Sequence, residues 1–160
     1  MTPPLLEKII SGGQTGADQG GWRAARECGI PTGGAMPRGF LTEDGPRPEF
    51  AELYGALELE TDEYRARTIR NVQDSDGTMW FGDYHSRGGA ATLDACRAHG
   101  KPFLIVFGGI TKPSEAKAWI EAKRIRVLNA AGNRESAKPG IGERVARFLG
   151  AVLEQLERGA

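Results

Sequence analysis

The sequence contains little cysteine and little histidine, the residues that most often build metal centres. Cys28 and Cys96 lie far apart and form no CxxC pair, and His85 and His99 make no close ligand pair. Zinc and disulfide chemistry therefore have little support, and no protein-ligated metal is expected. We expect both cysteines to be thiols of the hydrophobic core.

The sequence also lacks an excess of charge of one sign and any long apolar run. The 21 basic and 21 acidic side chains cancel, which leaves no general electrostatic reason to bind along a nucleic acid or to an anionic membrane. Any anion site must therefore be local. No apolar run approaches the roughly 18 residues of a membrane-spanning helix, and the start has no signal-peptide pattern. We expect a cytoplasmic protein with no membrane partner.

Short apolar runs alternate with helical patterns along the chain. The strand candidates are Lys8–Ser11, a weaker one around Ile30, Leu57–Leu59, Thr78–Phe81, Phe103–Phe107 and Ile125–Leu128. The helix candidates are Ala17–Cys28, a segment beginning near Asp62, one from Gly89, one capped by Ser114, and one with the apolar stripe Ile141, Val145, Phe148, Val152 and Leu156. This alternation predicts an α/β fold with a mostly parallel sheet and helices on both faces. The length fits one domain over residues 1–160.

Four polar, glycine-bearing loops each follow a predicted strand. Their sequences are SGGQTGAD, FGDYHSRGGAAT, FGGITKPS and NAAGNRESAKPG. In a parallel sheet all four emerge at the same carboxyl edge, which is where open α/β folds bind ligands. A single loop of this kind is more simply explained as a tight strand-to-helix turn. Four of them together favour a ligand site.

The loop HSRGGAAT has the features of a phosphate site. It offers an anion the backbone N–H groups of a helix start, a hydroxyl and a guanidinium. The residues concerned are Ser86, Arg87, Gly88, Gly89 and Thr92. The structural alternative is that Ser86 only caps the helix and Arg87 is solvated.

The first loop is expected to meet hydroxyl or amine groups of the ligand. Asp18 falls in the opening turn of a helix, where the helix dipole stabilises its carboxylate, and that charge would repel a phosphate. Alternatively, Asp18 only caps its own helix. The remaining candidates in this loop are Gly12, Gly13, Gln14, Thr15 and Gly16, whose glycines would let a ligand approach the backbone closely.

Two further groups of polar side chains complete the candidate binding residues. Arg67 and Asn71 lie one helical turn apart in YRARTIRN, and the segment NRES contributes Arg134, Glu135 and Ser136. A charged face that is simply exposed would have the same pattern.

One long irregular segment, AMPRGFLTEDGPRPEF, is rich in proline, glycine and charge. A loop of this length inside a compact domain is more often functional than not. We interpret it as a lid.

Four motifs occur in order along the chain: SGGQTGADQGGWRAA, YRARTIRNVQDSDGTMWF, GGAATLDACRAHGKPFLIV and LNAAGNRESAKPGIGERV. Together they resemble the molybdenum carrier family, a circularly permuted branch of the group that contains molybdenum-cofactor carriers and Lonely Guy proteins. The resemblance implies a Rossmann-like three-layer sandwich, a homo-oligomer, and a phosphorylated nucleotide-like or pterin ligand at the carboxyl edge. If the ligand is molybdenum cofactor, the sulfurs of molybdopterin already hold the metal, so scarce cysteine and histidine are no objection.

The enzymatic alternative is a nucleoside-monophosphate phosphoribohydrolase of the Lonely Guy type, whose loop reads PGGxGTxxE. The loop is matched in part by Gly88, Gly89 and Thr92. Ala91 replaces its last glycine and Ala95 its catalytic glutamate, while Asp94 lies one residue early, a rotation of about 100° around a helix. Asp18 or Glu135 could supply a carboxylate from another loop. No catalytic residue is assigned.

Overall fold

The structure is a computed structural model that describes residues 5–158. Its main sheet has six strands in the order β5–β2–β1–β8–β6–β7, and every neighbouring pair is parallel. The strands are β1 (Lys8–Ile10), β2 (Thr32–Met36), β5 (Ala56–Glu58), β6 (Gly77–Phe81), β7 (Phe103–Val106) and β8 (Val127–Gly132). The predicted parallel sheet is confirmed.

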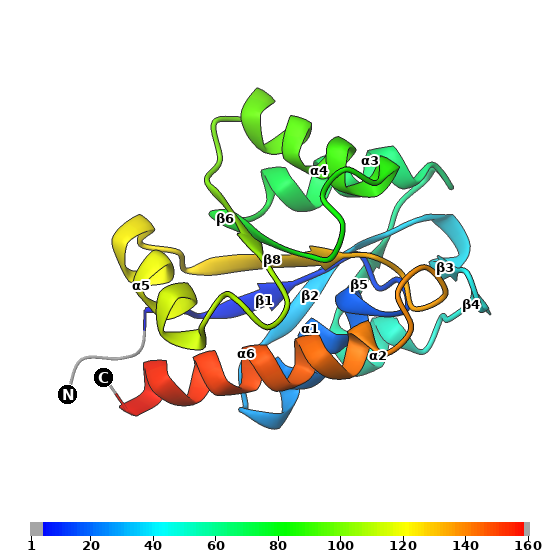
Figure 1. Ribbon diagram of the computed structural model, residues 1–160. Helices are drawn as coiled ribbons and strands as arrows, with labels where there is room; N and C mark the ends of the chain where they lie inside the picture. Colours follow the sequence, from blue (N-terminus) through cyan, green and yellow to red (C-terminus); the bar gives the residue numbers. More distant parts are fainter. Residues whose placement is uncertain (1–4, 159–160) are drawn as a thin grey trace.

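Helices cover both faces of this sheet (Figure 1). One layer contains α3 (Tyr64–Gln73) and α4 (Arg87–Ala98), and the other contains α1 (Ala17–Glu27), α5 (Pro113–Lys123) and α6 (Ile141–Arg158). A short helix, α2 (Phe50–Tyr54), precedes β5. The Rossmann-like three-layer α/β sandwich is therefore confirmed. None of the described helices is long and apolar enough to cross a membrane.

Strand β6 shows how the core is divided between the two layers. Successive side chains of a strand point to opposite faces. Met79 and Phe81 pack in the large cluster with α1, α5 and α6, whereas Trp80 faces the α3 and α4 side. The predicted stripe of α6 belongs to the large cluster, where Ile141 and Val145 are buried and Phe148 is partly buried.

Two strands lie later in the chain than predicted. Strand β8 was expected at Ile125–Leu128 and β2 around Ile30, but their true spans are rich in alanine and glycine, residues with low strand propensity. Close packing explains this composition. A Cβ on Gly132 would lie 2.3 Å from the carbonyl oxygen of Phe81, and one on Gly34 would lie 2.0 Å from that of Ser11.

Two helix starts and one cysteine also differ from expectation. Helix α4 begins at Arg87, before the predicted Gly89. Helix α5 has Lys112, not Ser114, at its N-cap because proline follows, and proline is favoured in the first turn. Cys96 is buried as expected, but Cys28 is exposed at the end of α1, so it is not a core thiol.

The irregular segment is only partly irregular. It contains a 3₁₀ turn, η1 (Arg38–Phe40), and a small antiparallel hairpin of β3 (Leu41–Thr42) and β4 (Gly45–Pro46). Figure 1 shows this hairpin beside the β8–α6 connection, at the end of the molecule that carries the carboxyl edge of the sheet. That position makes contact with the predicted binding loops possible.

Candidate functional site

A small polar cavity lies at the carboxyl edge, between the first loop, α3 and α4 on one face of the sheet. Its volume is about 50 Å³. It is lined by Gly12, Asp18, Arg67, Thr68, Asn71, Trp80, Gly88, Thr92, Asn129, Ala131 and Gly132. The structure thus brings together residues predicted from the first loop, from YRARTIRN and from HSRGGAAT. We call this space the polar cavity.

Asp18 is the carboxyl in the wall of the polar cavity. Its side chain is 6% exposed, and Oδ2 lies 3.3 Å from Arg67 Nη1 and accepts a hydrogen bond from the backbone N–H of Gln14 at 3.2 Å. Burial raises the pKa of Asp18 to about 6, against the opposing effect of the Arg67 guanidinium. The carboxyl therefore changes its charge close to neutral pH.

Two hydrogen-bond donors of this cavity are left without partners. Arg67 Nε and Trp80 Nε1 are buried and make no hydrogen bond within the described residues, and both side chains line the polar cavity. A buried donor without a partner costs about 1–3 kcal/mol, and such groups are rare in folded proteins. A bound group with hydrogen-bond acceptors beside these two side chains would offer the donors the partners that the protein does not supply.

Other predicted residues form the walls of the cavity through bonds within the protein. Asn71 exchanges two hydrogen bonds with the backbone of Ala35, of 2.8 and 3.0 Å, which tie α3 to β2. The Thr92 hydroxyl donates to the carbonyl oxygen of Gly88 at 2.8 Å. A Cβ on Gly12 would lie 2.4 Å from Arg67 Nη1, so glycine at this position makes room for that arginine.

The predicted phosphate loop contains a capped helix start. The Ser86 hydroxyl donates to Asp83 O at 2.7 Å and accepts from Gly89 N at 3.1 Å and Asn133 Nδ2 at 3.2 Å. Ser86 therefore caps α4, as the alternative interpretation of this loop expected. Arg87 is exposed and does not line the polar cavity, whereas Gly88 does.

The far end of the first loop is bound by a carboxylate from the irregular segment. Glu43 accepts hydrogen bonds from the Thr15 hydroxyl, the Ser136 hydroxyl and the Ser136 N–H, the last at 3.2 Å. Gln14 Oε1 in turn accepts from Glu43 N at 2.8 Å. Although partial burial opposes it, these hydrogen bonds from Ser136 and Thr15 lower the pKa of the Glu43 carboxyl. We call this set of bonds the Glu43 latch.

The remaining candidates from NRES lie outside the polar cavity. The Glu135 carboxylate accepts hydrogen bonds from Gly140 N and from Gly142 N, the latter at 3.1 Å, and so satisfies the start of α6. Arg134 is exposed, with its guanidinium carbon 6.0 Å from the centre of the Tyr64 ring. Neither side chain joins Asp18 in the cavity.

Two glycines of the first loop also serve the protein's own packing. A Cβ on Gly16 would lie 2.6 Å from the backbone oxygen of Asn133, and one on Gly13 would lie 2.6 Å from the sulfur of Met36. Both glycines have positive φ values, of 81° and 73°. The first loop is therefore shaped by its neighbours as well as by any ligand.

Sequence reasoning missed the strand residues that form the floor of the cavity. Trp80 belongs to a strand that was predicted only as core, and Asn129 begins the predicted loop NAAGNRESAKPG but was not among the candidate site residues. Both line the cavity from strands, β6 and β8. Asn129 Nδ2 donates to Thr78 Oγ1 at 3.1 Å, one buried polar residue bonded to another. The available signals were the one polar side chain of β8, Asn129, and the indole N–H of Trp80, which usually has a partner when buried.

Within residues 5–158, no group of three or more His, Cys, Asp or Glu side chains is arranged to hold a metal ion. The acidic residues described above accept hydrogen bonds from arginine, hydroxyl and backbone N–H donors.

Comparisons with known proteins agree with this architecture. A model of the circularly permutated YpsA SLOG family matches residues 9–153. A crystal structure of a putative molybdenum carrier protein from Syntrophus aciditrophicus SB is 36% identical, with a TM-score of 0.85, over 94% of this chain and 96% of that chain. A search of curated proteins found no match. The family match includes every residue that lines the polar cavity.

Proposed function

Because the chain belongs to the circularly permutated YpsA SLOG family, we propose that it is a small-molecule binding protein whose ligand is a phosphorylated nucleotide-like or pterin compound. The carrier name of the similar structure supports molybdenum cofactor as the pterin ligand. The observation that carries the proposal is the pair of buried, unpartnered donors, Arg67 Nε and Trp80 Nε1, in the polar cavity.

The polar cavity holds one end of this ligand. Its volume of about 50 Å³ is far below that of pockets that enclose a whole drug-sized ligand, so it accepts a single group such as a phosphoryl. Arg67 and Trp80 donate to that group, together with N–H groups at the start of α4 near Gly88. The uncharged part of the ligand extends out of the cavity, and the hydroxyl or amine groups nearest the phosphoryl donate hydrogen bonds to Asp18 in the cavity wall.

A molybdenum cargo would need no metal ligand from the protein. The dithiolene sulfurs of the pterin supply the metal's coordination, and the protein supplies donors for the phosphate and pterin oxygens. In line with the resemblance we also propose a homo-oligomer, which sedimentation of the purified protein would test. From the sequence pattern we propose a cytoplasmic location, which cell fractionation would test.

Replacing Trp80 by phenylalanine tests the role of the unpartnered donor. This change keeps an aromatic ring in the core but removes the N–H together with one ring of the indole. AMP affinity should fall about tenfold while the fold is retained, as is typical for one hydrogen bond. Calorimetry with AMP and with adenosine measures the effect. Trp119→Phe, in α5 on the other side of the sheet, is the matched control.

Mass spectrometry and metal analysis of gently purified protein identify the natural ligand. A phosphorylated pterin or nucleotide in the purified protein is the expected result. If no such compound copurifies and neither AMP nor a pterin phosphate binds, the proposal is wrong.

The phosphoribohydrolase is a second candidate because Asp18, a carboxyl with a pKa of about 6, lies in the cavity. General acid–base catalysis requires such a group near the operating pH. Helix α4 offers no carboxyl in place of the catalytic glutamate of the Lonely Guy loop. Ala95, at the matching position, is buried with Val72 and Cys96, and Asp94 is exposed and paired with Arg97.

We expect slow or absent release of adenine from AMP, measured by chromatography after incubation. Losing a positioned acid typically costs a factor of about 10² to 10⁴ in rate. Rapid adenine release that is abolished in Asp18→Asn would instead establish the enzyme.

A further inference from the structure

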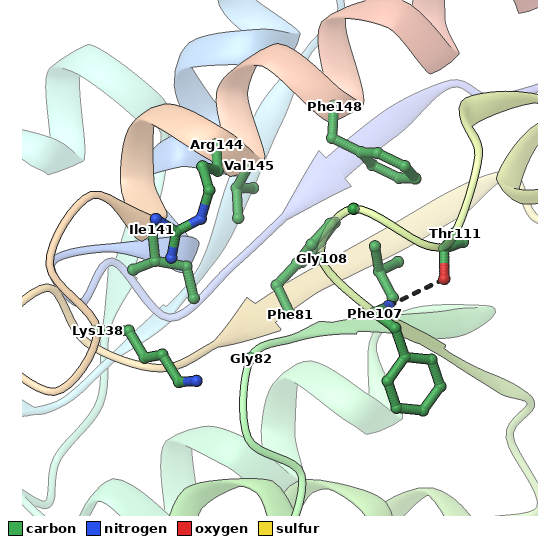
Figure 2. A pocket seen from close by; sticks show the side chains of 12 residues that line it. Phe81, Gly82, Phe107, Gly108, Thr111, Lys138, Ile141, Arg144, Val145 and Phe148 are labelled. Atoms are coloured by element: carbon green, nitrogen blue, oxygen red, sulfur yellow. Dashed lines mark hydrogen bonds between the residues drawn. The ribbon is translucent and has the colours of Figure 1, made fainter.

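A second and larger cavity lies on the opposite face of the sheet. It has a volume of about 210 Å³ and lies between the ends of β6 and β7, the loop that follows β7, and the first half of α6 (Figure 2). Phe81 of β6 lines it, whereas the preceding residue, Trp80, lines the polar cavity. The sheet therefore separates the two spaces. We call this second space the apolar cavity.

The inner wall of the apolar cavity is aliphatic and aromatic. It consists of Phe81, Val106, Ile141, Val145 and Phe148. The rings of Phe81 and Phe148 meet edge to face, with their centres 5.8 Å apart. A cavity of about 150 Å³ lined by such side chains can hold benzene, so this one has room for a six-membered ring and a short polar arm.

Two cations lie beside this apolar wall. Lys138 and Arg144 both line the cavity, and its twelve lining residues include no aspartate or glutamate. Figure 2 shows the Lys138 amino group and the Arg144 guanidinium on the same side of the cavity, next to Ile141. Among the described residues, neither side chain forms an ion pair, and Arg144 makes one long hydrogen bond of 3.4 Å to Pro139 O. These two charges are available to an anion.

The loop after β7 leaves one side of the cavity open. A Cβ on Gly108 or Gly109 would meet nothing within 4 Å, and Phe107 and Ile110 expose large apolar side chains. The Thr111 hydroxyl accepts a hydrogen bond from Phe107 N at 2.9 Å, which fixes the turn (Figure 2). A ligand can therefore enter past an apolar rim.

We propose that the apolar cavity binds a small carboxylic acid with an aromatic or branched aliphatic body. The body fills the space against Phe81 and Phe148, and the carboxylate pairs with Lys138 and Arg144. This ligand differs in chemistry and in position from the phosphorylated compound proposed for the polar cavity, so the two proposals can fail separately.

Calorimetry with three probes separates the contributions of ring and charge. 3-Phenylpropionate carries both, 3-phenylpropanamide only the ring, and propionate only the carboxylate. We expect 3-phenylpropionate to bind at least tenfold more tightly than either of the others. Equal binding of the amide and the acid, or no binding of the acid at millimolar concentration, would overturn the proposal.

Two variants and a matched control test the cations. Lys138→Gln and Arg144→Gln should each weaken 3-phenylpropionate at least fivefold and leave the amide unaffected. Arg147→Gln, on the same helix with a side chain 80% exposed and paired with Glu143, should change neither. A loss in Arg147→Gln equal to that in Arg144→Gln would show a general charge effect and contradict the site. Thermal melting confirms that each variant is folded.

Amide NMR shifts then locate the probe. The acid should shift the signals of Gly82 and Gly108, which line the apolar cavity, and leave Gly12 and Gly88 of the polar cavity unchanged. Shifts confined to Gly12 and Gly88 would place the acid in the other site and refute the proposal.

Discussion

Asp18 is the residue in which burial and charge conflict most directly. The residue is buried, and desolvation outweighs the attraction of Arg67, which lies 3.3 Å away. Folding therefore favours the protonated carboxyl. The stability that results is fully present below the ordinary pKa of 3.8 and is lost as the pH rises through about 6.

Asp18→Asn should remove this pH dependence. Each pKa unit corresponds to about 1.4 kcal/mol, so the free energy of unfolding of the native protein should fall by about 2 kcal/mol between pH 4 and pH 7 because of this group. Urea unfolding at several pH values, compared between the native protein and the variant, measures the difference. Asp94→Asn, at an exposed position, should leave the profile unchanged. Parallel profiles for the native protein and Asp18→Asn would contradict the expectation.

At the level of elements, the β3–β4 hairpin is held by the Glu43 latch. Its partners are 28 residues away at Thr15 and 93 residues away at Ser136. The segment interpreted as a lid is therefore connected to both the first loop and the β8–α6 connection. It contacts the end of the first loop that is not in the polar cavity.

Glu43→Gln should loosen the hairpin. An amide keeps the shape but removes the charge that strengthens the bonds from Thr15 and Ser136, so a loss of about 1 kcal/mol is expected for this partly exposed group. Hydrogen exchange of the amides at residues 40–47 should become faster, while exchange in β6 stays slow. Glu49→Gln, in the same segment and bonded to Arg47, is the control. Unchanged exchange in the hairpin would show that other contacts hold it.

The elements also show how far sequence reasoning reaches. Helix α6 was predicted closely because its apolar stripe repeats over many turns. Strand β8 was predicted too early in the sequence. Its second half, from Ala130 to Gly132, has no residues that favour strands, and close packing determines its composition. The local sequence pattern predicts an element correctly where its apolar side chains form the packing surface, as in α6. It fails where small residues are required because the backbone of a neighbouring strand packs closely, as in β8.

For the molecule as a whole, the location of the site at the carboxyl edge of the sheet could be predicted. Which residues line the polar cavity and which line the apolar cavity could not. Parallel strands bring their following loops to one edge, so the meeting of Asp18, Arg67 and Gly88 follows from topology. Which face of the sheet Trp80 takes depends on the register and packing of β6. The Glu43 latch depends on contacts between distant segments, which no local pattern contains. For the same reason the apolar cavity, with Lys138 and Arg144, was not foreseen.

Two carboxyl groups at the first loop, Asp18 and Glu43, lose their protons in the opposite order to free aspartate and glutamate. An isolated aspartate loses its proton before a glutamate, but here Glu43 ionises below its ordinary range and Asp18 only near pH 6. In mildly acidic solution the polar cavity is thus free of negative charge while the hairpin is still bound. Uptake of a phosphorylated ligand should then draw in a proton, and a rise in pH should promote release. The phosphate of AMP also titrates at about pH 6, so calorimetry of AMP binding at pH 7 in two buffers of different ionisation enthalpy is compared between the native protein and Asp18→Asn to count that proton. An equal difference between the two buffers for both proteins would show that ligand exchange is not coupled to the proton of Asp18.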